Sequence, residues 1–242
     1  MARIPDWLKL PFEEALEYHT NKIALPAESL EQLMAEYHDL AFVVSGLTRA
    51  DLTSDMQWLI ERAIADGMSL EDFKRQFDRL ISRKGWQPKG NKDARLRTIF
   101  DTNQRRSQAA GHFKRMREPE MVNRRPYWMW KWRDSVVPRP HHKALDGKVF
   151  LASEPFWEIA MCPCAYGCRC TVFALSERDI QRMGKTVEKP PDPKTIAEKG
   201  FQRAPGLNGD RDRFEILKEG LSRQSPTIRK LAEAELKKKG VL

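Results

Sequence analysis

The spacing of apolar residues changes at Pro126, and this change most constrains what the chain can fold into. Before it, apolar side chains recur every three or four residues. After it, the run Tyr127–Arg133 alternates, with Trp128, Trp130 and Trp132 on one parity. Spacings of three and four are typical of amphipathic helices, whereas a period of two with many aromatic residues indicates a strand. We therefore expect an α+β fold, with a helical N-terminal half followed by a small antiparallel sheet.

Capping residues delimit several of the predicted helices. Ser69 stands three residues before Asp72, as an N-cap does, and Gly46 and Gly85 stand where helices end. The spacing predicts helices over residues 12–19, 27–45, 50–65, 70–84 and 92–116.

Two short apolar runs beyond Pro126, at 148–151 and 171–175, can pair with the aromatic strand as an antiparallel sheet. His- and Cys-bearing loops then lie at the ends of these strands. A short helix over 176–184, a Pro-rich linker or ordered loop, and a last helix over 225–239 complete the chain. The sequence thus divides into a helical region (1–90), a core with the long basic helix, aromatic strand and His/Cys loops (91–176), and a Pro-rich segment with the C-terminal helix (177–242).

The chain of 242 residues carries a net charge of +9, and the excess is concentrated between Arg95 and Arg139. A field of this sign attracts polyanions, double-stranded DNA among them, without regard to sequence. A helix flank exposed to solvent explains the same charges equally well. The candidate nucleic-acid-binding residues are those of the long helix, namely Arg95, Arg97, Arg105, Arg106, Lys114 and Arg115.

No run approaches the roughly 20 apolar residues of a membrane span, and the N-terminus lacks the apolar stretch of a secretion signal. We therefore expect no membrane partner and a cytosolic protein. A reducing compartment keeps cysteines as thiols, which favours metal binding or packing over disulfides.

All four cysteines lie within nine residues, with the spacing C-x-C-x3-C-x-C, and His142 precedes them by twenty residues. Thiolates and imidazole form tetrahedral structural zinc sites, so zinc is the one cofactor that the pattern suggests. The spacing differs from the usual C-x2-C, and C-x-C pairs on a strand point to opposite faces, so buried thiols packed as small apolar residues remain the alternative. The candidate ligands are His142, Cys168 and Cys170, with Cys162 and Cys164 as further ones.

The only evidence for catalysis in the sequence is the presence of residue types that enzymes use. Cys168 with His142 could form a nucleophile pair, and His142 with Arg139 an acid–base pair of a nuclease or other hydrolase. The sequence has no phosphate-binding glycine loop, no H-E-x-x-H and no nucleophile elbow. We therefore expect no enzyme. Asp146 precedes Gly147, and this pair is a strong tight-turn signal, so Asp146 is expected to shape a turn.

Several motifs, taken in order, resemble the phage Mu F-like family of head morphogenesis (minor head) proteins. They include PFEEALEYHTNKIALPAES, AIADGMSLEDFKRQFDRLISRKGW, LRTIFDTNQRRSQAAG, RPYWMWKW, RPHHKALDGKVF, EPFW and CRC, and the resemblance covers roughly residues 10–206. The family-like positions are His142, Asp146, Gly147, Trp157, Cys168, Arg169 and Cys170. The chain departs from the family pattern at Cys162–Gly167, where the family usually has Pro-Pro-Asn-Gly-Trp-Gly, so Cys162 and Cys164 are additional.

The resemblance implies a structural role. Such proteins belong to the phage procapsid in few copies, associate with the portal, and assist head assembly and DNA packaging or delivery. It implies the portal protein and the capsid as partners, DNA as a non-specific one, and a location in the host cytoplasm during assembly and in the virion head afterwards.

Overall fold

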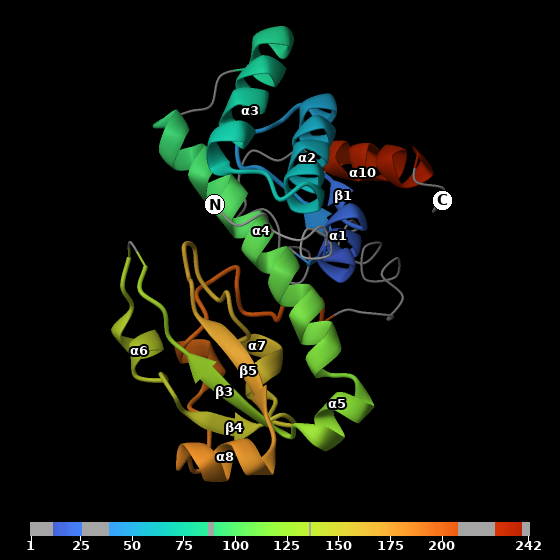
Figure 1. Ribbon diagram of the computed structural model, residues 1–242. Helices are drawn as coiled ribbons and strands as arrows, with labels where there is room; N and C mark the ends of the chain where they lie inside the picture. Colours follow the sequence, from blue (N-terminus) through green and yellow to red (C-terminus); the bar gives the residue numbers. More distant parts are fainter. Residues whose placement is uncertain (1–11, 26–38, 87–89, 136, 208–225, 239–242) are drawn as a thin grey trace. The chain divides into compact units, whose positions relative to one another are not determined.

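The computed structural model describes residues 12–25, 39–86, 90–135, 137–207 and 226–238 (Figure 1). Contacts divide the chain into two compact units, one of residues 1–108 with 210–242 and one of residues 109–209. Helices dominate the first unit and a small antiparallel sheet forms the second, so the expected α+β class is confirmed. The division of the sequence into regions 1–90, 91–176 and 177–242 rests on residue patterns and stays a prediction.

The first unit is built from helices whose apolar stripes meet. Its helices are α1 (Glu13–Thr20), α2 (Ala50–Ala65), α3 (Leu70–Lys84), the first part of α4 (Lys92–Met116), and α10 (Pro226–Lys238). The bounds agree with the predicted helices to within one or two residues. For α2, α3 and α4 the reason is that each apolar stripe packs in the core of this unit. The core of this unit is formed by Phe42, Val44, Leu47, Leu52, Met56, Leu59, Ile60, Ala63, Phe73, Phe77, Leu96 and Phe100.

Both ends of α3 have the predicted caps. The Ser69 hydroxyl accepts a hydrogen bond from the backbone N–H of Asp72 at 3.1 Å. Gly85 ends the helix with φ of 68°, a left-handed conformation that favours glycine, and its N–H donates to the carbonyl of Ile81.

The helix predicted over 27–45 is wrong in its last part. Ala41–Phe42 form a short strand, β2, which pairs in parallel with β1 (Ile23–Ala24). Both strands are fully buried, so pairing within the core outweighs the helical spacing of the sequence. Residues 26–38 of that prediction lie outside the described residues.

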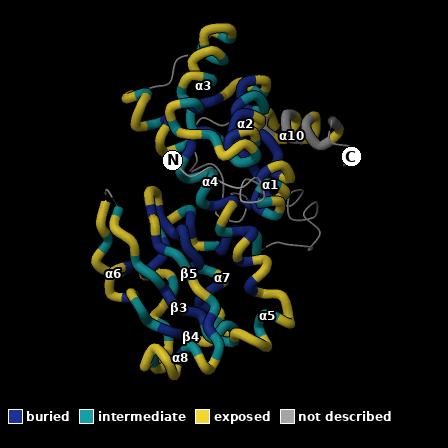
Figure 2. Tube along the Cα trace, viewed as in Figure 1, coloured by how far each residue is buried: buried dark blue, intermediate teal, exposed yellow. Residues whose placement is uncertain are grey.

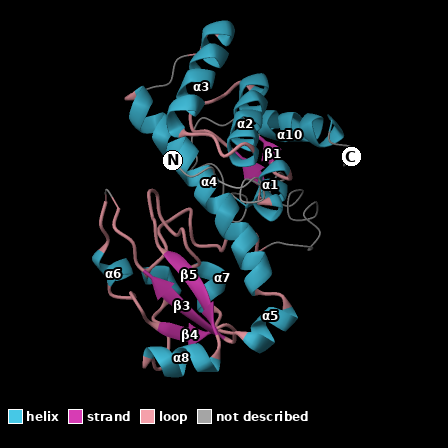
Figure 3. Cartoon of the chain, in the orientation of Figure 1, coloured by secondary structure: helices cyan, strands magenta, loops and turns pink. Residues whose placement is uncertain are grey.

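The second unit is organised around a three-stranded sheet in the order β4-β3-β5 (Figure 3). The strands are β3 (Tyr127–Lys131), β4 (Val149–Leu151) and β5 (Thr171–Leu175), and both pairings are antiparallel. Trp128 lies opposite Phe150 on one side and Ala174 on the other. The predicted sheet is confirmed, although its central strand ends two residues early.

The alternation along β3 places different side chains on its two faces, and Figure 2 shows the middle of this strand as buried. Trp128 and Trp130 join the larger core, where Trp128 packs against Trp157 with ring centroids 5.5 Å apart. Met129 faces the other way and packs with Ile180 of α8 (Glu177–Met183). The sheet therefore has apolar contacts on both faces.

Long connections complete this unit, and they carry the short helices α5 (Pro119–Arg124), α6 (Pro140–Lys143), α7 (Phe156–Ile159) and η4 (Pro193–Thr195). The segment after η4 contributes Ile196, Phe201 and Ala204 to the core that also contains the cysteines. The sequence allowed either a linker or an ordered loop here. The segment after η4 is an ordered loop, because its apolar residues pack in the core.

Candidate metal centre

His142 is the buried centre of the His/Cys loops. It lies on α6, whose first residue, Pro140, supplies a backbone angle suited to a helix start. The side chain is only 2% exposed, and the Trp130 ring packs edge-on against it at 5.7 Å. Its Nε2 lies 3.0 Å from the carbonyl oxygen of Ile196, a distance at which the Nε2–H donates a hydrogen bond.

Three thiols surround this imidazole. The Sγ atoms of Cys168 and Cys170 lie 3.7 and 3.9 Å from Nδ1, and that of Cys164 lies 3.7 Å from Nε2. One ligand atom each from His142, Cys168 and Cys170 can be chosen so that all lie within 4.8 Å of one another. The structure therefore brings the predicted ligands together.

The two remaining predicted ligands join the same cluster. The Cys162 thiol interacts with the thiols of Cys164, Cys168 and Cys170, and all four cysteines are buried and free of disulfides. Residues 162–170 form turns and loop, and β5 begins only at Thr171. The expectation that C-x-C pairs would diverge on a strand therefore does not apply, because this segment is not a strand.

The electrostatics of the cluster favour a thiolate at Cys168 and a protonated thiol at Cys162 and Cys164. Contacts with Cys162, Cys164 and Cys170 hold the pKa of the Cys168 thiol far below its usual range. Burial disfavours the imidazolium form of His142, yet its contacts with Cys164 and the other thiols raise the pKa of His142 to about 12. Burial raises the pKa of the Cys162 thiol. The positive charge of the His142 imidazolium thus balances the negative charge of the Cys168 thiolate.

Asp146 and Gly147 lie in the turn that follows α6. The Asp146 carboxylate accepts a hydrogen bond from the backbone N–H of Trp132 at 3.0 Å and pairs with Lys131. Gly147 has φ of 75°, and its N–H donates to the Trp130 carbonyl at 2.8 Å. Asp146 therefore shapes a turn, in agreement with the sequence-based interpretation.

The geometry gives no support to a hydrolase. Arg139, the suggested partner of His142 in an acid–base pair, is bound to Glu198 at 2.6 Å and to the carbonyl of Tyr166 at 3.0 Å. Cys168 and His142 are close enough to share a proton, but both side chains are buried. A buried cluster of this kind is suited to holding the fold.

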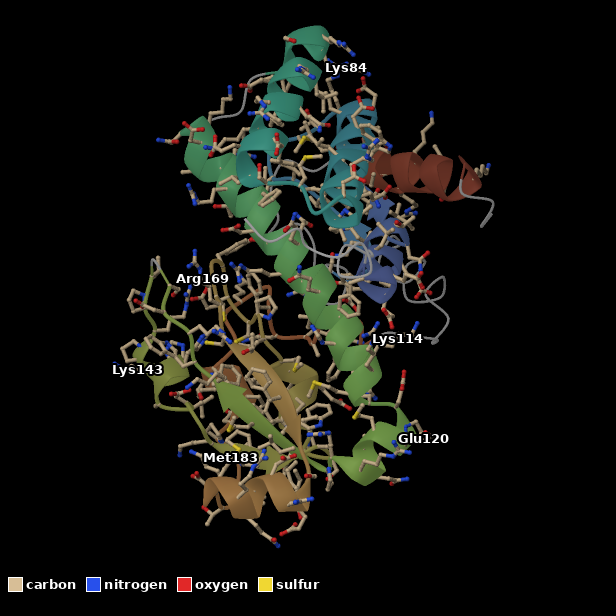
Figure 4. All side chains as sticks on the ribbon, viewed as in Figure 1. Lys84, Lys114, Glu120, Lys143, Arg169 and Met183 are labelled. Atoms are coloured by element: carbon tan, nitrogen blue, oxygen red, sulfur yellow. The ribbon has the colours of Figure 1, made fainter. Side chains whose placement is uncertain are left out.

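The basic residues of α4 are placed less uniformly than the sequence suggests. Arg97, Lys114 and Arg115 are exposed, and Figure 4 labels Lys114 on the helix surface. Arg105 is partly buried. Arg106 is buried, where it hydrogen-bonds the Tyr18 hydroxyl.

Arg95 is also partly buried. Its Nη2 donates to the Ser45 carbonyl, and its guanidinium lies 6.0 Å from the centre of the Trp86 ring. Arg95 and Arg106, both predicted to contact nucleic acid, are thus engaged within the protein.

Sequence reasoning missed the contribution of the segment after η4 to the site. Ile196 supplies the carbonyl that orients His142, and Glu198 binds Arg139. Every residue has a backbone carbonyl, so the type of residue 196 does not reveal this contact. The carbonyl also lies 54 residues from the imidazole in the sequence. Only the Pro density of this stretch marked it, as a linker or an ordered loop.

The fold and the site together define a class: an α+β protein whose buried imidazole–thiol cluster holds loops around a small sheet. A family model described as "Phage Mu protein F like protein" matches residues 54–173, a range that includes most of α2, all of α3 and α4, most of the sheet, His142 and all four cysteines. The chain belongs to this phage Mu F-like family, as its motifs indicated.

Two curated relatives are each named as an F protein. The chain is 31% identical over 157 residues to the "Mu-like prophage FluMu F protein" of Haemophilus influenzae, which covers 61% of this chain and 37% of that protein. It is 29% identical over 193 residues to the "Putative capsid assembly protein F" of Escherichia phage Mu, which covers 74% of this chain and 44% of that protein. The chain thus spans less than half the length of either relative.

No solved structure matches the chain significantly. Within the part of the chain that the structure describes, no helix is long and apolar enough to cross a membrane.

Proposed function

We propose that this chain is a minor head protein that assists assembly of a phage or prophage capsid. The observation that carries the proposal is the match to the Mu F-like family, one relative of which is named as a capsid assembly protein. The buried His/Cys cluster supports a structural role over an enzymatic one. The protein acts in the host cytoplasm during assembly and remains in the virion head.

Its principal partner is the portal protein of the same phage. Co-expression of the tagged chain with the cognate portal tests this, and we expect the two to co-elute in size exclusion at physiological salt. The major capsid protein expressed alone serves as the comparison for non-specific adhesion. Complete separation of chain and portal at low salt would rule out a direct complex.

Presence in the head is tested separately. Mass spectrometry of procapsids and mature virions, purified on gradients, should detect the chain in both at a copy number well below that of the major capsid protein. Its absence from both particles would exclude the role of a head component.

The chain also contacts packaged double-stranded DNA, without sequence preference, through the exposed cations of α4. Arg97, Lys114 and Arg115 are exposed to solvent. Each neutralised phosphate releases condensed counterions, so the logarithm of the affinity falls with the logarithm of salt concentration at a slope of about −0.9 per contact. Replacing all three by Ala should reduce that slope by about 3.

A matched control separates specific placement from total charge. Lys189, Lys194 and Lys199 are exposed and lie outside α4, so their triple Ala variant loses the same charge elsewhere. We expect this control to keep the salt slope of the unaltered protein. Equal slopes in both triple variants, or no salt dependence at all, would remove α4 as the DNA-binding element.

A further inference from the structure

We propose that His142, Cys162, Cys168 and Cys170 hold one Zn²⁺ ion in a tetrahedral structural site, and that Cys164 packs beside it without ligating. This inference rests on the geometry of the cluster alone. It stands or falls independently of the role in capsid assembly.

The two nitrogen–sulfur separations among His142, Cys168 and Cys170 are close to those that zinc imposes. With Zn–S of about 2.3 Å and Zn–N of about 2.0 Å, neighbouring sulfur and nitrogen ligands of a tetrahedron lie about 3.6 Å apart. The observed distances from His142 Nδ1 are 3.7 Å to Cys168 Sγ and 3.9 Å to Cys170 Sγ. A small adjustment of side-chain angles brings all three onto one ion.

The imidazole is oriented as in a metal ligand. Its Nε2–H points to the Ile196 carbonyl at 3.0 Å, which leaves Nδ1 as the nitrogen that can give up its proton to bind a metal ion. Zinc-bound histidines typically donate their other ring N–H to a carbonyl or carboxylate in this way. Nδ1 faces Cys168 and Cys170, where the ion would lie.

The contacts of Cys162 and Cys164 identify the fourth ligand. The Cys162 thiol interacts with both Cys168 and Cys170, so it lies next to the sulfur pair that, with Nδ1, outlines the site. Cys164 also interacts with Cys168, but it approaches the imidazole at Nε2, the nitrogen that is bound to Ile196. We therefore assign Cys162 as the fourth ligand and Cys164 as its non-ligating neighbour.

The chemistry of the donor set selects zinc. Thiolate sulfur with one imidazole in a tetrahedral arrangement is typical of structural Zn²⁺. Binding releases three protons to solvent: those of the Cys162 and Cys170 thiols and the one that Cys168 and His142 share. The ligands are then three thiolates and a neutral imidazole, and no atom is oxidised or reduced.

The ion would join segments that are far apart in the sequence. It ties α6 through His142 to the loop between α7 and β5, and the Ile196 hydrogen bond attaches the segment after η4. Since the sheet has only three short strands, such a link adds order where the sheet itself supplies little.

The first experiment uses the unaltered protein, purified without chelator from cells supplied with zinc. Elemental analysis should give one zinc per chain, and X-ray absorption at the zinc edge should show three sulfur ligands and one nitrogen ligand. Absence of zinc would overturn the site. Four sulfur ligands would overturn the assignment of His142.

A matched pair of variants two residues apart tests the fourth ligand. Cys164→Ser should retain one zinc per chain and an unchanged absorption spectrum, whereas Cys162→Ser should lose most of its zinc at equal chelator competition. Loss of zinc from Cys164→Ser would overturn the ligand set. If Cys162→Ser does not fold, Cys164→Ser and the ligand count of the unaltered protein still decide the matter.

Discussion

Asp146 fixes the loop between β3 and β4 by two interactions of different strength. Its carboxylate accepts the backbone N–H of Trp132 at 3.0 Å and pairs with the Lys131 ammonium at 3.1 Å. Burial acts to raise the pKa of this carboxyl, but the Lys131 contact and the Trp132 N–H together hold it below its usual range. The buried His142 lies four residues earlier, so the turn also determines where α6 presents the imidazole.

Asp146→Ala should lower the free energy of unfolding by about 1 kcal/mol at neutral pH, since it leaves the Trp132 N–H without its acceptor. Asp146→Asn keeps an acceptor oxygen and should recover much of the loss. Because the folded-state pKa is depressed, the carboxylate contributes above the unfolded-state value of 3.8 and loses its contribution as pH falls through the folded-state pKa. Urea unfolding at neutral and acidic pH measures both effects.

Lys131→Met is the control for the ion pair. The pair is partly exposed, with side-chain exposures of 44% and 35%, so its loss should cost less than that of the backbone hydrogen bond. A Lys131→Met variant as unstable as Asp146→Ala would show that the ion pair, and not the Trp132 N–H, carries the effect.

At the scale of helices and strands, local sequence patterns predicted the bounds of single elements and the faces of their side chains. α4 has the bounds that its three-and-four spacing predicts, and β3 has the alternation that separates Trp128 from Met129. The β1–β2 pair was missed because two-residue strands are too short to show a period, and their pairing depends on residues 18 positions apart.

Gly206 tests how the segment after η4 packs on α4. A Cβ at this position would lie 3.1 Å from Ala110 Cβ and 3.4 Å from its Cα, and φ is +78°. Gly206→Ala should therefore destabilise the protein by about 2–4 kcal/mol, the sum of a left-handed backbone and overpacking. Thermal and urea unfolding measure the change.

Gly184→Ala is the matched control for backbone conformation. Gly184 ends α8 with φ of +59°, and an added Cβ would meet nothing within 4 Å. Only the left-handed backbone then contributes, so about 1–2 kcal/mol is expected. Equal losses in the two variants would mean that the segment yields at Ala110 and does not pack tightly there.

Across the whole chain, the sequence predicted contacts between residues close in sequence and missed those between residues far apart. The thiol cluster was evident because its members lie within nine residues, and the helices because their signals are local. The carbonyl of Ile196 and the carboxylate of Glu198 reach the site from 54 and 59 residues away, and nothing in their residue types marks them. Likewise, the buried Arg106 hydrogen-bonds Tyr18 of α1, which lies 88 residues earlier in the sequence.

The two units have separate hydrophobic cores, and the proposed zinc site belongs to only one of them. Removing the metal should therefore loosen the second unit while the first keeps its protection. In hydrogen exchange followed by mass spectrometry, amides of β3 and β5 should exchange faster after treatment with a strong chelator, and those of α2 and α3 should not change. Adding Zn²⁺ back should restore slow exchange in the strands, which excludes irreversible damage by the chelator. Faster exchange in α2 and α3 to the same degree would mean that the two cores unfold together, and unchanged exchange in the strands would mean that no ion stabilises them.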